Sequence, residues 1–159
     1  YKGLGVLINS FKYLKNENVK LIIAGEFYEP IDKYLNIIKE LNLSEKIIID
    51  NNFLDSKKIR DYMCASEIVI QPYIKASQSG ITPVAYFYET PLIVSNIKGL
   101  KEIVERDNSG EVFNKTSENL SKVILNSLKN NNQETYRDNI KKSKSKYTWS
   151  RFIQEIEKV

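Results

Sequence analysis

The chain alternates short apolar runs with stretches of helical periodicity. In each short run the apolar residues, many of them β-branched, occupy consecutive positions instead of every second one. That pattern is typical of strands in a parallel sheet that is buried on both faces. Strands are therefore predicted at residues 19–24, 46–50, 68–70 and 92–94, with a weaker one at 111–113.

Helices are predicted between these strands. Apolar residues recur at steps of three and four over residues 4–14 and 31–41, and a third helical run ends near Tyr88. A strand, helix, strand order implies right-handed crossover connections. The predicted fold class is therefore α/β: a doubly wound, Rossmann-like parallel sheet with helices on both faces.

The C-terminal part is predicted to be helical. Residues 116–119 have the pattern of a capping box before a helix over 120–128, and three asparagines at 130–132 form a linker. Residues 133–159 contain the C-terminal helices, a basic one followed by an amphipathic one. The apolar residues of the last helix are Trp149, Phe152, Ile153 and Ile156.

The domain organisation follows from this order of elements. We predict a single domain over residues 1–159. A sheet domain whose first element is a helix usually has an earlier strand or a partner domain nearby. We therefore expect this chain to be one domain of a larger protein.

The composition excludes several kinds of site. There is no histidine and a single cysteine, Cys64, which excludes a disulfide framework, the common zinc sites and Ser-His or Cys-His dyads. Cys64 lies among apolar and small residues and is predicted to be buried. No acidic cluster has the spacing of metal ligands, and no glycine-rich dinucleotide motif follows the first strand. We expect neither a metal nor a cofactor.

The charge pattern is mildly basic, with a net charge of +4 and a pI near 9.0. Basic residues concentrate only at 141–146, where no aromatic residues are interleaved, so a solvated helix face is favoured over a nucleic-acid site. Binding to anionic lipid headgroups stays an alternative. No apolar run reaches the ~20 residues that cross a bilayer, and no signal-peptide pattern opens the chain, so a cytoplasmic protein is expected.

Ligands of doubly wound sheets bind beyond the carboxyl ends of the strands. This rule selects the loops at 25–28, 51–54, 72–79 and 95–99. The segment SQSGITP at 77–83 is polar and leads into a helix, so its backbone N–H groups are predicted to converge on an anion. The alternative is an ordinary helix cap, since these residue types are common there. The place of the segment on the ligand edge favours a phosphate site.

Five segments in this order resemble the C-terminal, donor-binding domain of bacterial family-4-type glycosyltransferases. The resemblance covers essentially the whole chain and implies one half of a GT-B architecture, in which two Rossmann-like domains face each other across a cleft. The YTW at 147–149 is similar to the aromatic end of such domains. The five segments are YKG (1–3), LIIAGE (21–26), SQSGITPVAY (77–86), TPLIVS (90–95) and GLKEIV (99–104).

The resemblance implies a site for the donor diphosphate. Lys2 would meet the diphosphate as a flexible point charge, which is how lysine generally serves phosphates. Backbone N–H groups around Ser79, Gly80 and Ile81 would cradle the same group, helped by the Thr82 hydroxyl. Two alternatives stay open: Lys2 is simply solvated, and Gly80 serves only the start of the helix.

The resemblance also implies a site for the nucleoside and the sugar. Gly25 and Glu26 would lie near the nucleoside together with Phe53 and Leu54, although a phenylalanine is more often part of the core. Tyr73 either contacts the donor sugar or only packs. The Glu102 carboxylate either contributes to this site or only interacts favourably with the helix dipole.

One departure from the family pattern concerns specificity. The usual motif has two glutamates eight positions apart, one for the sugar and one for the ribose, and Ala76 and Val84 stand at these positions. Ser77 and Gln78 would have to supply hydroxyl and amide contacts instead. The identity of the donor is therefore left open.

The resemblance implies a glycosyltransferase that moves a sugar from a nucleotide-diphosphate sugar to a glycan or lipid-linked acceptor, with retention at the anomeric carbon, in synthesis of a surface polysaccharide. No catalytic residue is identified in this chain, and acceptor residues would lie on an N-terminal domain. The isolated domain would then be inactive. The alternative is a Rossmann-like binding or regulatory module that catalyses no reaction, which the absence of both glutamates would indicate.

Overall fold

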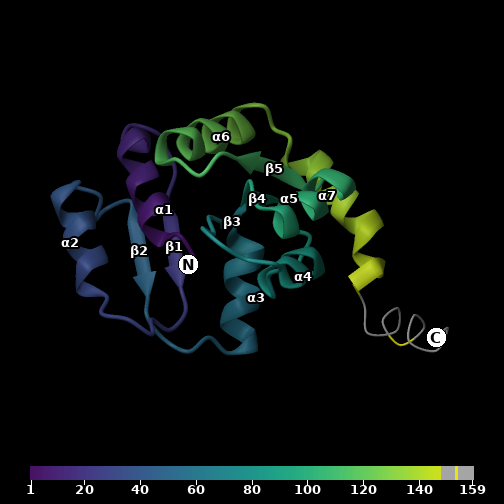
Figure 1. The fold of residues 1–159 in the computed structure, drawn as a ribbon, viewed down its shortest axis with the longest axis horizontal. Helices are drawn as coiled ribbons and strands as arrows, with labels where there is room; N and C mark the ends of the chain where they lie inside the picture. Colours follow the sequence, from purple (N-terminus) through teal and green to yellow (C-terminus); the bar gives the residue numbers. More distant parts are fainter. Residues whose placement is uncertain (148–152, 154–159) are drawn as a thin grey trace.

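Five parallel strands form two sheets in the computed structural model, which describes residues 1–147 and Ile153 (Figure 1). Strand β1 (Leu21–Ala24) pairs with β2 (Ile47–Asp50). Strand β3 (Val69–Gln71) pairs with β4 (Leu92–Ser95), and β4 pairs with β5 (Gly110–Phe113). All five predicted strands are confirmed, and every pair in the described residues is parallel.

Helices connect the strands and continue beyond the last one (Figure 1). The first predicted helix is an α-helix followed by a 3-10 turn, and residues 56–65 add a helix between β2 and β3. The elements are α1 (Leu4–Ser10), η1 (Phe11–Leu14), α2 (Asp32–Glu40), α3 (Ser56–Ala65), α4 (Ile81–Phe87), α5 (Lys98–Asp107), α6 (Ser117–Lys129), α7 (Gln133–Ser143) and η2 (Lys144–Tyr147).

The core lies on both faces of β4. Ile93 belongs to one cluster of buried residues, which α1, α2 and α6 help to build. Its neighbours Leu92 and Val94 belong to a second cluster, which includes residues of α4, α5 and α7. Successive residues of a strand point to opposite faces, so consecutive apolar residues require helices on both sides. The predicted fold class is confirmed.

One face of the β1–β2 ladder is an exception. Ile22 and Ile48 are register partners on adjacent strands, and their exposed fractions are 40% and 48%. The prediction that every strand is covered on both faces is therefore wrong for this pair. Ile22 and Ile48 belong to neither cluster of buried residues, and α3, the helix that follows β2, has no buried residue.

The same helix corrects a second prediction. Cys64 lies in α3 and is exposed, although the small and apolar residues around it predicted a buried thiol. The α3 helix is instead held by polar contacts at the end of β2. Tyr62 donates to Asp50 at 2.7 Å and Lys58 Nζ lies 3.0 Å from the same carboxylate. Hydrogen bonds from Asn52, Tyr62 and Lys58 lower the pKa of Asp50 to about 2.

The helices after β5 follow the predicted pattern. The Thr116 side chain accepts a hydrogen bond from the Asn119 N–H and caps α6, which begins directly after it and ends just before the predicted linker at 130–132. The basic helix is confirmed as α7. Of the predicted last helix, Trp149, Phe152 and Ile156 lie outside the described residues, and Ile153 is helical and exposed.

A buried carboxylate connects η2 to α4 and α5. Asp107, at the end of α5, is 6% exposed and accepts hydrogen bonds from Tyr147 (2.9 Å), Tyr86 (3.2 Å) and Lys146 (3.0 Å). Arg106 donates to both oxygens at 3.0 Å. Burial alone would raise the pKa of Asp107, but the bonds from Arg106, Lys146 and Tyr147 outweigh it and hold that pKa well below its usual range.

Candidate functional site

Lys2 is placed at the ligand edge by the glycine that follows it. Gly3 has a left-handed φ of 70°, and a Cβ there would lie 1.8 Å from the carbonyl oxygen of Pro72. Only glycine therefore allows α1 to start against the end of β3. The Ile74 N–H also donates to the Tyr1 carbonyl at 2.8 Å. These contacts join the chain start to the loop after β3.

The Lys2 ammonium lies beside two aromatic rings. Its Nζ is 5.6 Å from the ring centroid of Tyr73 and 5.9 Å from that of Tyr1. Among the residues that the structure describes, Lys2 has no carboxylate in ion-pair range. An aromatic ring attracts a cation through its quadrupole and leaves the net charge unchanged. The positive charge of Lys2 therefore stays available to an anion.

Tyr73 connects Lys2 to the loop that was predicted to bind phosphate. The Tyr73 side chain is buried, with 6% exposed, which agrees with the packing alternative for its ring. Its hydroxyl lies 3.1 Å from Ser79 Oγ, a hydrogen bond in which either group can donate. The Tyr73 carbonyl accepts a 2.6 Å bond from the Ser95 hydroxyl at the end of β4. Lys2, Tyr73 and Ser79 are thus brought together.

The amides of the predicted cradle are only partly free. Ile81 N–H donates to Ser79 Oγ at 3.2 Å, and Thr82 N–H donates to the Ser79 carbonyl at 3.3 Å. Within residues 1–147, Gly80 N–H makes no hydrogen bond, and a Cβ on Gly80 would meet no atom within 4 Å. The loop is therefore open at Gly80, and Ser79 occupies the two N–H donors that follow Gly80.

Thr82 differs from the prediction. Its side chain is 3% exposed and its hydroxyl exchanges hydrogen bonds with the buried Gln71, at 3.1 and 3.2 Å to the two amide atoms. The hydroxyl joins α4 to β3 and has no access to a ligand. The sequence signal for this was Gln71 itself, a polar residue directly after the predicted strand 68–70, which needs a hydrogen-bond partner if it is buried.

The residues predicted to lie near the nucleoside are in the loops that follow β1 and β2. Gly25 follows β1 with a φ of 128°, which favours glycine, and Glu26 beside it is exposed. Phe53 follows β2 and is 75% exposed, so the core alternative for it is wrong, while Leu54 is half-buried. Their loops are joined by a bond that the sequence did not indicate, from Phe27 N–H to Asn51 Oδ1 at 3.0 Å.

The start of α5 supports the loop from below. A Cβ on Gly99 would lie 1.7 Å from the carbonyl oxygen of Ser77, so the loop rests directly on this helix. The Ser77 and Gln78 side chains are exposed, as their predicted roles in a polar site require. Glu102 is exposed on α5, one turn away from Gly99.

A second cation was missed by the sequence reasoning. Lys115 Nζ donates to the carbonyl of Ile74 at 3.1 Å, next to Tyr73. Lys115 follows β5, which was predicted as a weak strand, and the loop after that strand was not included among the ligand loops. Applying the strand-end rule to all five strands would have found it.

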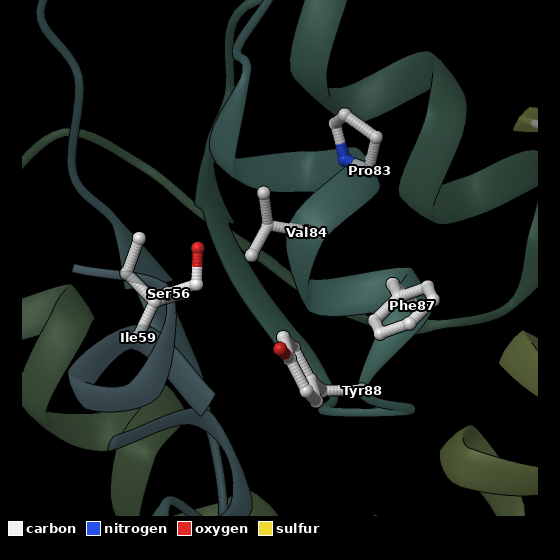
Figure 2. Close-up of a pocket in the computed structure, with 6 residues that line it drawn as sticks. All are labelled: Ser56, Ile59, Pro83, Val84, Phe87 and Tyr88. Carbon is white, nitrogen blue, oxygen red and sulfur yellow. The ribbon is translucent and has the colours of Figure 1, made fainter. Parts of the chain in front are cut away.

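An apolar pocket of about 310 Å³ lies between α3 and α4 (Figure 2). Val84, one of the two positions where the resemblance implies a glutamate, lines this pocket, and Ala76, the other, packs partly buried against the second core cluster. Neither position offers a carboxylate to a sugar or a ribose. In the described chain no group of three metal-ligating side chains is present either. The pocket is lined by Ser56, Ile59, Pro83, Val84, Phe87 and Tyr88.

The fold is similar to that of several solved glycosyltransferases. HepE (Alr3699) of Anabaena, in complex with UDP-glucose, gives a TM-score of 0.82 at 20% identity, covering 92% of this chain and 41% of that chain. WaaG, a glycosyltransferase involved in lipopolysaccharide biosynthesis, gives 0.78 at 15% identity, covering 91% and 39%. The C-terminal domain of the group 1 glycosyl transferase LpcC of Francisella tularensis gives 0.79 at 17% identity, covering 93% and 80%. The fold is that of a Rossmann-like domain of GT-B glycosyltransferases.

The sequence matches the model of the family described as glycosyl transferases group 1 over residues 1–146. The chain belongs to this family, and the resemblance seen in the sequence is confirmed. It spans about two fifths of the length of the HepE and WaaG chains, 41% and 39%. A search of curated protein sequences gave no match. No helix in the described part of the chain is long and apolar enough to cross a membrane.

Proposed function

We propose that residues 1–159 form the donor-binding domain of a glycosyltransferase that uses a nucleotide-diphosphate sugar. One observation carries the proposal: in a chain of this family, Lys2 and Ser79 come together through Tyr73 at the carboxyl edge of the sheet. The similarity to HepE, solved with UDP-glucose, supports a sugar nucleotide as the ligand.

The residues suggest how this domain would assist transfer. Negative charge grows on the diphosphate as the bond to the sugar breaks, and fixed donors aimed at it lower the barrier. Lys2 supplies a charge there, Gly80 N–H supplies a free amide, and Lys115 adds a second cation to the same loop. We expect no metal, since these groups oppose the charge themselves. No base is needed from this chain.

Finer features of the activity extend the proposal. We propose transfer of a hexosyl group with retention, to a glycan or lipid-linked acceptor bound by an N-terminal domain. Similarity to WaaG supports a role in surface polysaccharide synthesis. Such an enzyme would work in the cytoplasm or at the inner face of the membrane, and the domain alone would bind the donor without transferring it.

A second candidate function is favoured by the α3–α4 pocket. The two positions where the family places carboxylates are Ala76 and Val84, and the pocket beside Val84 is apolar. A domain that binds a nucleotide without chemistry would need neither glutamate. Turnover of sugar nucleotides by the full-length protein, with and without acceptor, separates transfer from binding alone.

Enlarging Gly80 tests the donor site directly. Gly80 has an ordinary helical φ of −65° and open space around it, so a side chain there enters the proposed ligand position without straining the fold. We expect Gly80→Leu to weaken UDP or GDP binding by about tenfold, which is the loss of roughly one charge-assisted contact, and Gly80→Ala to weaken it less. Calorimetric titration measures this effect.

The control is Thr135→Leu, a change to an exposed residue in the first turn of α7. Nucleotide affinity should be unchanged in this variant, and thermal midpoints of all three variants should stay close to that of the wild type. If the wild-type chain bound neither nucleotide, or Gly80→Leu bound as well as the wild type, the donor-site proposal would be wrong.

A further inference from the structure

Tyr73 contacts both groups that the proposed site needs. Its ring lies 5.6 Å from Lys2 Nζ, and its hydroxyl lies 3.1 Å from Ser79 Oγ. The peptide unit that follows Tyr73 is held by two hydrogen bonds, because the Tyr73 carbonyl accepts from Ser95 and the Ile74 N–H donates to the Tyr1 carbonyl. A rigid residue thus lies between two groups from distant parts of the sequence.

We infer that Tyr73 is a positioning residue for diphosphate binding, which holds the Lys2 ammonium and the Ser79 hydroxyl at the loop after β3. The inference rests on the proposed function and assigns to Tyr73 a role through Lys2 and Ser79, in place of direct contact with the donor sugar. The burial of Tyr73 favours this role, since 6% exposure leaves little of the ring for a ligand.

The ring fixes the ammonium at low electrostatic cost. A carboxylate beside Lys2 would hold it more strongly but would cancel the charge that a diphosphate must meet. The Tyr73 face holds the cation and leaves it positive, and the edge-to-face contact with Tyr1, at 6.2 Å between centroids, keeps both rings in place. Less side-chain entropy is then lost when Lys2 meets an anion.

The hydroxyl has a separate effect on Ser79. Ser79 Oγ accepts from Ile81 N–H, and an entering phosphate oxygen would compete for that donor. Once displaced, Ser79 Oγ still has the Tyr73 hydroxyl as its partner. Tyr73 therefore lowers the free-energy cost when Ile81 N–H leaves Ser79 Oγ and donates to a ligand, because the Ser79 hydroxyl is not left unpaired.

A purely structural role makes a different prediction. Tyr73 also belongs to the second core cluster. If packing were its whole contribution, changing it would lower stability and would weaken UDP and UMP binding alike. If Tyr73 is a positioning residue, changing it lowers the affinity for UDP relative to UMP, and the part of this loss that the ring causes disappears when Lys2 is absent.

The test measures UDP and UMP affinities of the chain by calorimetry. Tyr73→Phe keeps the ring, the volume and the fold but removes the hydroxyl, and should lower the UDP-to-UMP affinity ratio about threefold, the effect of one neutral hydrogen bond. Tyr73→Leu also removes the ring and should lower the ratio further, to about tenfold below the wild type, as a cation–ring contact is lost as well. In a Lys2→Ala background, Tyr73→Leu should lower the ratio only about threefold, which is the part due to the hydroxyl, because no ammonium is left for the ring to hold.

Tyr13 provides a matched control, because Lys12 Nζ lies 4.8 Å from its ring centroid in an equivalent contact on η1. Tyr13→Phe and Tyr13→Leu should leave both affinities unchanged. An unchanged ratio in Tyr73→Phe and Tyr73→Leu, with wild-type UDP binding intact, overturns the assignment of Tyr73 alone. Failure of the wild type to bind UDP overturns the proposed UDP site and the assignment together.

Discussion

Replacing Asp107 with alanine is expected to lower the free energy of unfolding by about 2–4 kcal/mol. The carboxylate is buried between α4, α5 and η2, and its removal leaves the Tyr147 hydroxyl without its acceptor and opens a cavity. The loss should fall below that of a fully buried ion pair, because Arg106 and Lys146 are more than half exposed and regain water. Asp107→Asn keeps the volume and should cost less.

The effect of Asp107 should also depend on pH. Its pKa is lowered in the folded state, so its contribution is fully present above the unfolded value of about 3.9 and is lost as pH falls below it toward the folded pKa. The difference in unfolding free energy between wild type and Asp107→Ala should therefore be constant from about pH 5 upward and should shrink in more acidic solution.

Urea unfolding across this pH range measures both effects. Asp138→Ala, at an exposed position of α7, is the matched control and should change stability little at any pH. Equal stabilities of Asp107→Ala and Asp138→Ala at neutral pH would show that the Asp107 contacts contribute nothing. A difference between wild type and Asp107→Ala that grew on acidification would contradict a lowered pKa of Asp107 in the folded state.

Lys2→Ala is expected to weaken UDP binding by roughly 10- to 100-fold, as expected for a lost hydrogen bond between charged partners. UMP binding should change far less, because the proposed contact of Lys2 is to the diphosphate. The wild-type affinity should fall with added salt, since the Lys2 side chain is exposed and its charge is screened. In Lys2→Ala the salt dependence should be smaller.

Lys12→Ala is the control for this change, because Lys12 also lies over a tyrosine ring and is exposed, but on η1. Its UDP affinity should equal that of the wild type. If Lys2→Ala lost affinity for UMP and UDP by the same factor, Lys2 would act on the nucleoside or the α-phosphate, which the two nucleotides share, and the expected preference for the diphosphate would be wrong.

The sequence was sufficient for the order of elements and for the fold class. Runs of consecutive apolar residues identified all five strands, and the strand-end rule identified the loop that carries Ser79 and Gly80. The sequence was insufficient where the burial of a side chain depends on whether another helix or strand packs against it. The environment of Cys64 looks apolar in sequence, but α3 is held by polar contacts to Asp50 and buries none of its residues.

Within the site, the sequence indicated which residues lie at the edge but not what they do there. Thr82 and Gln71 are both polar residues in apolar surroundings, and only the structure shows that they satisfy each other. The link from Lys2 to Ser79 through Tyr73 spans three segments, so no local pattern contains it. Lys115 was missed because its strand was weakly marked.

Gly3 has a mechanical consequence for a two-domain enzyme. The close approach of Gly3 to Pro72, together with the bond between Tyr1 and Ile74, makes Lys2 part of the same rigid body as β3. Under the proposed function, the ammonium would therefore move together with the loop after β3. The lysine and that loop would then meet a diphosphate as one preformed surface, in any orientation that this domain takes toward another.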